Sequence, residues 1–158
     1  MRPNDEVLAE LDDLEAWSRT GPAGRGTITL LDYVGFIATP DAFFGFAALF
    51  WPDTLVHEGH VFLASGFEVA SFDAWRDRGL ALREIQRVMN HVHVSTVLQN
   101  QDISDAVARE VARVLAAVWT RTLGAEGLEV ECFGESFHDA AVTFSQRIVL
   151  RGGGAAST

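Results

Sequence analysis

The segment Leu55-Val56-His57-Glu58-Gly59-His60-Val61-Phe62-Leu63 (LVHEGHVFL) contains the clearest turn signal in the chain. Two short apolar runs flank Glu58-Gly59, and glycine readily adopts the positive φ that a two-residue hairpin turn requires. We therefore predict a β-hairpin with its tip at Glu58-Gly59. In this hairpin His57 and His60 lie opposite each other on one face, with Cβ atoms about 5 Å apart.

Hydrophobic periodicity and capping residues predict the elements on either side of the hairpin. Helices are expected at residues 3–17, 39–51, 71–79, 80–90 and 102–123, the last of them capped by Asp102 or Ser104. Strands are expected at 128–133 and 141–150, where apolar and polar side chains alternate. Residues 28–38 are apolar, β-branched and aromatic, and we interpret them as a strand or an extended segment.

This order of elements has no regular βαβ rhythm, which favours an α+β fold over a doubly wound α/β fold. We expect one antiparallel sheet of about four to five strands, in which the hairpin and the strands at 128–133 and 141–150 join. Several helices pack against this sheet. Residues 1–150 are expected to form a single globular domain, and the Gly/Ala/Ser-rich residues 151–158 to form a disordered tail.

The segment Phe43–Trp51 (FFGFAALFW) is apolar on nearly every helical face. Such a helix is usually buried in a protein core, and we expect burial here. Two alternatives remain open. The helix forms a partner-binding surface, or it lines an apolar pocket of a small-molecule-binding module.

Composition and charge exclude several classes of protein. The formal net charge of −10 argues against binding to nucleic acid, because phosphate contacts need a basic face. The N-terminus has acidic residues where a signal peptide needs basic ones, and the longest apolar block, Phe43–Trp51, is too short to span a bilayer. The lone cysteine, Cys132, suits a reducing compartment. We expect a cytoplasmic protein that does not enter membranes.

No diagnostic catalytic motif is present, so the sequence gives no firm indication of an enzyme. The chain contains no lysine, since all 12 of its basic residues are arginine, and this excludes Schiff-base and Walker-type lysine chemistry. Ser136-Phe137-His138-Asp139 lies between two predicted strands and is interpreted as a turn. Cys132 alternates in phase with Leu128 and Val130, so we expect it to pack inside as a small apolar residue.

Two pairs of histidines are the candidate metal ligands. His57 and His60 face each other at the hairpin tip, and His91 and His93 share one side of an extended segment. If the pairs met, four imidazoles would suit a transition metal such as zinc, and the chain would be a metal-binding protein or a metal-dependent enzyme. We do not expect them to meet, and with no metal site the protein needs no cofactor.

The chain loosely resembles the small acidic immunity proteins that neutralise bacterial toxins. The resemblance rests on size, negative charge, and the succession of a hairpin, a long helix and two final strands. It implies a binding protein that covers a basic protein partner with carboxylates, here Asp12, Asp13, Glu15, Glu129 and Glu131. The acidic residues Glu129 and Glu131 are expected to face water. Homodimerisation through the last strand is a further possibility, because an unpaired sheet edge invites another chain.

Overall fold

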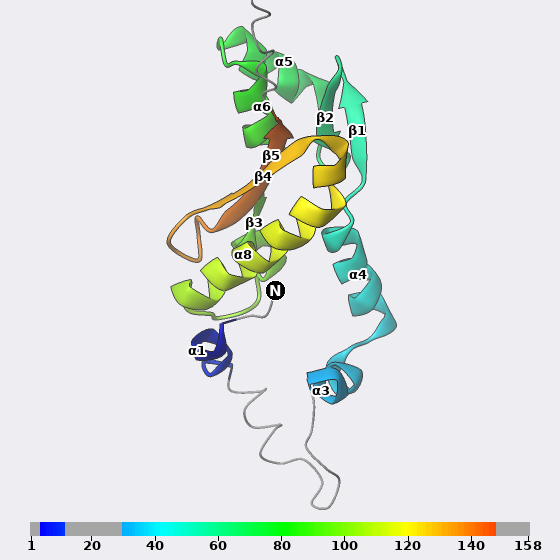
Figure 1. Ribbon diagram of the computed structural model, residues 1–158. Helices are drawn as coiled ribbons and strands as arrows, with labels where there is room; N and C mark the ends of the chain where they lie inside the picture. The colour runs from blue at the N-terminus through cyan, green and yellow to red at the C-terminus, as the bar shows by residue number, and fades with distance from the viewer. Residues whose placement is uncertain (1–3, 12–29, 148–158) are drawn as a thin grey trace, which may run out of the picture.

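The computed structural model describes residues 4–11 and 30–147, and it has the predicted α+β architecture (Figure 1). The helices are α1 (Asp5–Leu8), α3 (Leu30–Ile37), α4 (Pro40–Phe50), α5 (Val69–Asp77), α6 (Leu82–Met89), α7 (Val94–Val97), α8 (Asp105–Thr122) and the 3₁₀ turn η1 (Gly124–Glu126). The strands are β1 (Thr54–His57), β2 (His60–Leu63), β3 (Val92–His93), β4 (Leu128–Phe133) and β5 (Ala141–Gln146). The predicted tail at 151–158 lies outside the described residues.

The strands β3, β5 and β4 form an antiparallel sheet with β5 in the centre. Its first face carries Val130, Val142 and Phe144, which join a core with buried residues of α8. The second face lies against α6, where Thr143 donates a hydrogen bond to the carbonyl oxygen of Arg87 at 2.8 Å. Because both faces are covered, β5 is buried from Ala141 to Ser145 even where its side chains are polar.

The predicted hairpin is confirmed in its register and in its turn. The strands β1 and β2 pair so that His57 lies opposite His60. Glu58 and Gly59 occupy the turn with φ values of 48° and 78°. Positive φ at both central residues is the backbone of the tight hairpin turn that matches the twist of the strands.

The prediction of one sheet is wrong, because β1 and β2 form a separate two-stranded sheet. Two buried amide side chains, Gln86 of α6 and Asn90 directly after that helix, lie where backbone pairing between the sheets was expected. The Nδ2 atom of Asn90 donates to the carbonyl oxygens of Val61 at 3.2 Å and Phe144 at 3.1 Å. The Nε2 atom of Gln86 donates to Val61, and its Oε1 accepts from the backbone N–H of Gln146. The two sheets are thus joined through side chains.

The N-terminal expectations are confirmed only in part. Asn4 caps α1, since its Oδ1 accepts from the backbone N–H of Glu6 at 3.0 Å. The helix ends at Leu8, so the prediction is wrong for residues 9–11, and residues 12–17 lie outside the described part of the chain. Residues 28–38 were predicted as extended, whereas α3 covers Leu30–Ile37. The physical reason is tertiary: Val34, Ile37 and Ala38 recur at helical spacing and line one groove with side chains of α4.

The C-terminal half of the chain follows the predicted helix and strand order closely. Ser104 caps α8, with its Oγ accepting from the backbone N–H of Val107 at 3.2 Å, and β4 has the predicted bounds. Cys132, however, is exposed. Burial in β4 decreases along the strand, from fully buried Leu128 at its start to exposed Cys132 and Phe133 at its end. The last strand was predicted as a free edge for dimerisation. Its described part, β5, instead lies in the centre of the sheet, between β3 and β4.

Candidate functional site

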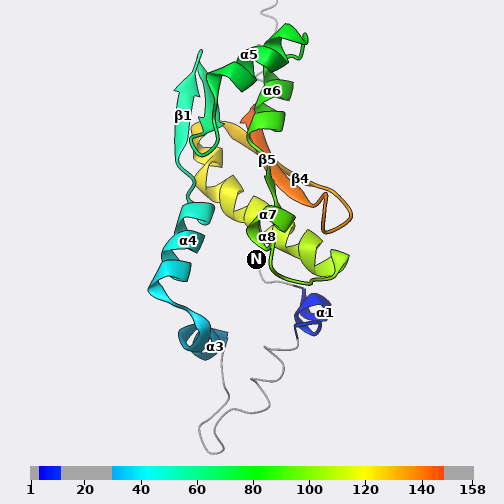
Figure 2. The same ribbon diagram turned by 180° about the vertical axis from the view of Figure 1, so that it is seen from behind.

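The helices α3 and α4 expose large apolar side chains that we call the apolar arm. Thr39 caps α4 through its Oγ1, Pro40 begins the helix, and Trp51 ends it, as predicted. The expected burial of this helix is wrong, since α4 contains no fully buried residue. In Figures 1 and 2 both helices lie to one side of the sheets, with α3 at the far end. The exposed side chains of the arm are Leu31, Val34, Phe36, Ile37, Phe43, Phe44, Phe46 and Trp51.

The reason for this exposure is that only the C-terminal end of α4 reaches the core. Leu49 and Phe50 pack against the core cluster around α8. The Nε1 atom of buried Trp119 donates to the carbonyl oxygen of Leu49 at 2.8 Å. Earlier turns of α4 extend beyond α8. Phe43 and Phe44 are 64% and 70% exposed as a result.

A groove of about 480 Å³ runs between the two helices of the arm. Side chains of α3 and α4 line it, including Val34, Ile37, Phe43 and Trp51. Residues 30–53, which contain the arm, include Asp32, Asp41 and Asp53 and no basic residue. The arm is therefore an apolar surface with carboxylates as its only charged groups.

A second apolar cavity, of about 260 Å³, lies between α4 and α8. Apart from Glu110, its lining side chains are apolar, and they include Phe46, Leu49, Val111 and Leu115. It shares residues of α4 with the arm. The cavity is large enough for a small apolar group.

No single helix in the described ranges has the length and hydropathy needed to cross a bilayer. The helical segments Leu31–Ile37 and Pro40–Phe50 have that length and hydropathy only when taken together, and the chain bends by 117° between them.

Two of the carboxylates predicted to bind a basic partner already have cationic neighbours within the chain. Arg83 lies 2.6 Å from Glu129 and 3.4 Å from Glu131, and Arg87 lies 2.7 Å from Glu131. These side chains are partly exposed. The arginines Arg83 and Arg87 of α6 compensate much of the negative charge of Glu129 and Glu131. Asp12, Asp13 and Glu15 lie outside the described residues.

The hairpin histidines have separate neighbours. The ring of His57 packs against Phe67 and Phe72, with ring centroids 5.2 Å and 4.8 Å apart. His60 forms a 2.5 Å hydrogen bond between its Nδ1 and Oε1 of Gln146. The hairpin pair thus packs against an aromatic cluster on one side and against the end of β5 on the other.

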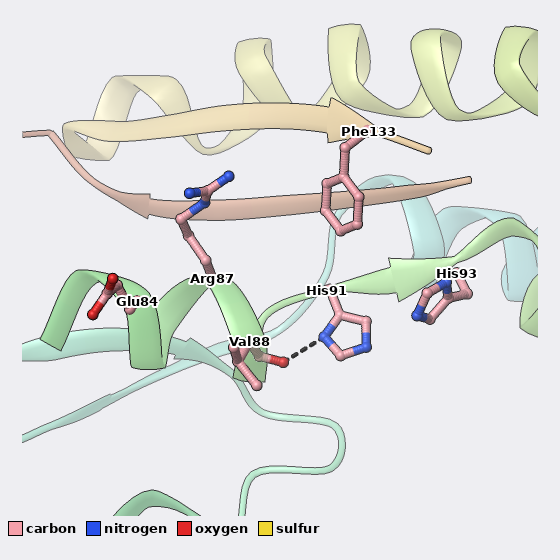
Figure 3. A pocket seen from close by; sticks show the side chains of 6 residues that line it. All are labelled: Glu84, Arg87, Val88, His91, His93 and Phe133. Carbon is pink, nitrogen blue, oxygen red and sulfur yellow. Dashed lines mark hydrogen bonds between the residues drawn. The ribbon is translucent and has the colours of Figure 1, made fainter. Parts of the chain in front are cut away.

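The second histidine pair lines a pocket of about 400 Å³, the histidine notch (Figure 3). His91 and His93 contact each other edge to face with ring centroids 4.8 Å apart, so both rings lie on one side, as predicted. The notch is completed by Glu84, Arg87, Val88 and Phe133. Burial lowers the pKa of His93, and the neighbouring His91 lowers it further, against the opposing effect of Asp139.

The described residues contain no group of three or more His, Cys, Asp or Glu side chains placed to hold a metal ion. The four-histidine metal site considered from the sequence is therefore not formed in the described structure. Ser136–Asp139 forms a turn, as predicted, in which Asp139 accepts hydrogen bonds from the backbone N–H and the hydroxyl of Ser136.

Sequence reasoning named the histidines of the notch but missed Phe133 and Arg87. The alternation of β4 places Phe133 on the same face of the sheet as Glu129 and Glu131, and this pattern in the sequence could have indicated that Phe133 lies near them. No family model, curated protein or solved structure matches this chain.

Proposed function

We propose that this chain is a small acidic cytoplasmic binding protein that docks a basic protein partner through the apolar arm. The observation that carries the proposal is the exposure of large apolar side chains on α3 and α4. The partner would present an apolar surface flanked by arginine or lysine side chains. This is an immunity-type role in which the contact surface differs from the carboxylates named from the sequence.

The area of the arm supports this role. A Phe or Trp side chain offers about 150–250 Å², so the five aromatic side chains of the arm, each about half to three-quarters exposed, present roughly 600 Å². A typical monomer has a largest apolar patch of about 300–600 Å². A standard protein interface covers about 800 Å² on each partner. With its aliphatic side chains the arm approaches the size of such an interface.

The charge of the arm favours a basic partner over a second copy of this chain or an anionic membrane. The charged residues of segment 30–53 are all carboxylates, and the whole chain has a net charge of −10. Like charges repel across an interface, whereas complementary charges steer association and select the partner. Aromatic residues at the centre of an interface usually contribute most of the binding energy.

The test uses two arm variants, Phe43→Asp and Phe44→Asp, and the matched control Val56→Asp. Val56 is 70% exposed and lies on β1, outside the arm. Each tagged protein is used to capture partners from cells that produce the chain. A captured basic protein is then purified, and its affinity for each variant is measured at low and high salt.

We expect the control to bind as the unaltered chain does, and the arm variants to bind at least tenfold more weakly. Binding of the unaltered chain should weaken as salt rises, because opposite charges contribute. Equal binding by all variants would contradict the role of the arm. A dimer of the chain that the arm variants dissociate, or binding to neutral lipid vesicles that they abolish, would contradict the choice of partner.

A small-molecule-binding role is the second candidate, supported by the apolar cavity between α4 and α8. An environment-sensitive apolar dye should then bind with one-to-one stoichiometry. Val111→Trp would fill the cavity and abolish binding, while Phe44→Asp, outside its lining, would leave binding unchanged.

A further inference from the structure

The histidine notch lies on the face of the three-stranded sheet that α6 covers, beside that helix and the segment that follows it. His93 pairs with Ala141 and Ala141 pairs with Phe133, so these residues form one row across the sheet. The helix ends at Met89, and the chain then turns into β3 through Asn90 and His91. The last part of the sheet face is left open between His91, His93 and Phe133 (Figure 3).

The two imidazoles of the notch retain capacity for hydrogen bonds. His91 Nδ1 donates to the carbonyl oxygen of Val88, which leaves its Nε2 available on the other side of the ring. His93 Nδ1 is buried and has no hydrogen-bond partner. A buried polar atom without a partner is uncommon in native structures, and because Nδ1 is closed to solvent, a ligand in the notch meets this ring only at its other atoms.

The charged groups of α6 give the notch a cationic wall. Arg87 is half exposed and uses Nη2 to bind Glu131 at 2.7 Å, while a guanidinium has five N–H donors in all. Glu84, the acidic residue in the lining, has a carboxylate oxygen that accepts from the backbone N–H of Ala81 at 2.9 Å. Donors to a ligand are thus in excess over acceptors.

The opposite wall is apolar. Phe133 is 45% exposed at the end of β4, and Val88 of α6, next to His91, is the other apolar residue of the lining (Figure 3). The volume of about 400 Å³ falls within the usual range for small-ligand sites. An aromatic ring packs well against a phenyl ring in stacked or edge-to-face geometry.

We propose that the histidine notch binds a small carboxylic acid that carries an aromatic ring. The carboxylate accepts hydrogen bonds from the free donors of Arg87 and from His93, and from His91 when that ring is protonated at both nitrogens, while the aromatic ring packs against Phe133. This site does not depend on the apolar arm, which lies on other elements.

Benzoate is the probe, and benzamide, which has nearly the same shape without the charge, is the matched neutral compound. The side-chain nitrogen resonances of His91 and His93 are followed by NMR during titration. We expect benzoate to shift both and to bind with a Kd on the order of 1 mM, as suits so small a ligand. Benzamide should bind at least tenfold more weakly.

His91→Gln and Phe133→Ala should each weaken benzoate binding about fivefold or more. His138→Gln, an exposed histidine outside the notch, should have no effect, and circular dichroism verifies that every variant is folded. Absence of benzoate binding at tens of millimolar, equal binding of benzamide, or unchanged binding by the two notch variants would each overturn the proposal.

Discussion

Asn90 donates a hydrogen bond from its side-chain Nδ2 to the carbonyl oxygen of Phe144 at 3.1 Å, which joins α6 to the central strand β5. The same Nδ2 donates to Val61, and Oδ1 accepts from the backbone N–H of Leu63 at 3.0 Å. One fully buried amide therefore satisfies three backbone groups of two different sheets. This connection takes the place of direct backbone pairing between β2 and β5.

Asn90→Ala should lower the free energy of unfolding by about 3 kcal/mol, because it leaves several buried backbone groups without partners. Asn100→Ala is the matched control, since Asn100 is exposed in a turn and should change stability by no more than about 0.5 kcal/mol. Urea unfolding followed by circular dichroism measures both. A loss at Asn90 no larger than at Asn100 would show that the amide does not join the sheets.

The same substitution should have opposite effects at two glycines. Gly59 has a φ of 78° in the hairpin turn, so Gly59→Ala should cost about 1–2 kcal/mol. Gly45 lies within α4, and a Cβ added there would meet no other atom within 4 Å, so Gly45→Ala should stabilise by up to about 1 kcal/mol. Thermal unfolding of the two variants tests the sign. A stabilising Gly59→Ala would contradict the left-handed turn.

Glu131→Gln should lower stability by less than about 1 kcal/mol, since the contacts with Arg83 and Arg87 are partly exposed. The loss should shrink at high salt because exposed charges are screened. Glu135→Gln is the control, because Glu135 is 92% exposed and lies 3.9 Å from Arg109. Equal losses at the two positions would show that the network on α6 contributes nothing of its own.

Acidification should destabilise the protein through His93. The folded state lowers the pKa of this residue, chiefly by burial, so the unfolded chain binds a proton first as the pH falls below about 6.5. The contribution of His93 to stability is complete above that pH and is lost as the pH falls toward the lower pKa of the folded state.

Urea unfolding at about pH 7.5 and pH 5.5 checks this expectation. His93→Asn should reduce the loss of stability between the two conditions, and His138→Asn, at an exposed position, should leave it unchanged. An identical pH dependence in the His93 variant and the unaltered chain would contradict the prediction.

Local signals predicted those elements whose conformation is set by neighbouring residues. Gly59 determined the hairpin, Thr39 and Pro40 the start of α4, and Ser104 the start of α8, because turns and caps depend on residues within one helical turn. The alternation of β4 gave its exact bounds. Residues 28–38 were misjudged because an apolar stretch of this length suits a strand as well as a helix.

The apolar arm and the histidine notch depend on contacts between residues that are distant in sequence. An apolar helix is compatible with a core, yet α4 is exposed because only Leu49 and Phe50 at its C-terminal end pack against the core cluster. Composition does not show which part of a helix the rest of the chain covers. The spacing of His91 and His93 predicted that they share a side, but Phe133 reached the notch only through the pairing of β4 with β5.

The sequence by itself determined the α+β class, the hairpin and the long helix, because capping, turn and periodicity are properties of nearby residues. Tertiary structure alone decided that the strands form two sheets, since Gln86 and Asn90 must be buried between them before their amides replace backbone pairing. It also decided that the apolar side chains of α3 and α4 face outward, because exposure depends on which other elements cover a helix.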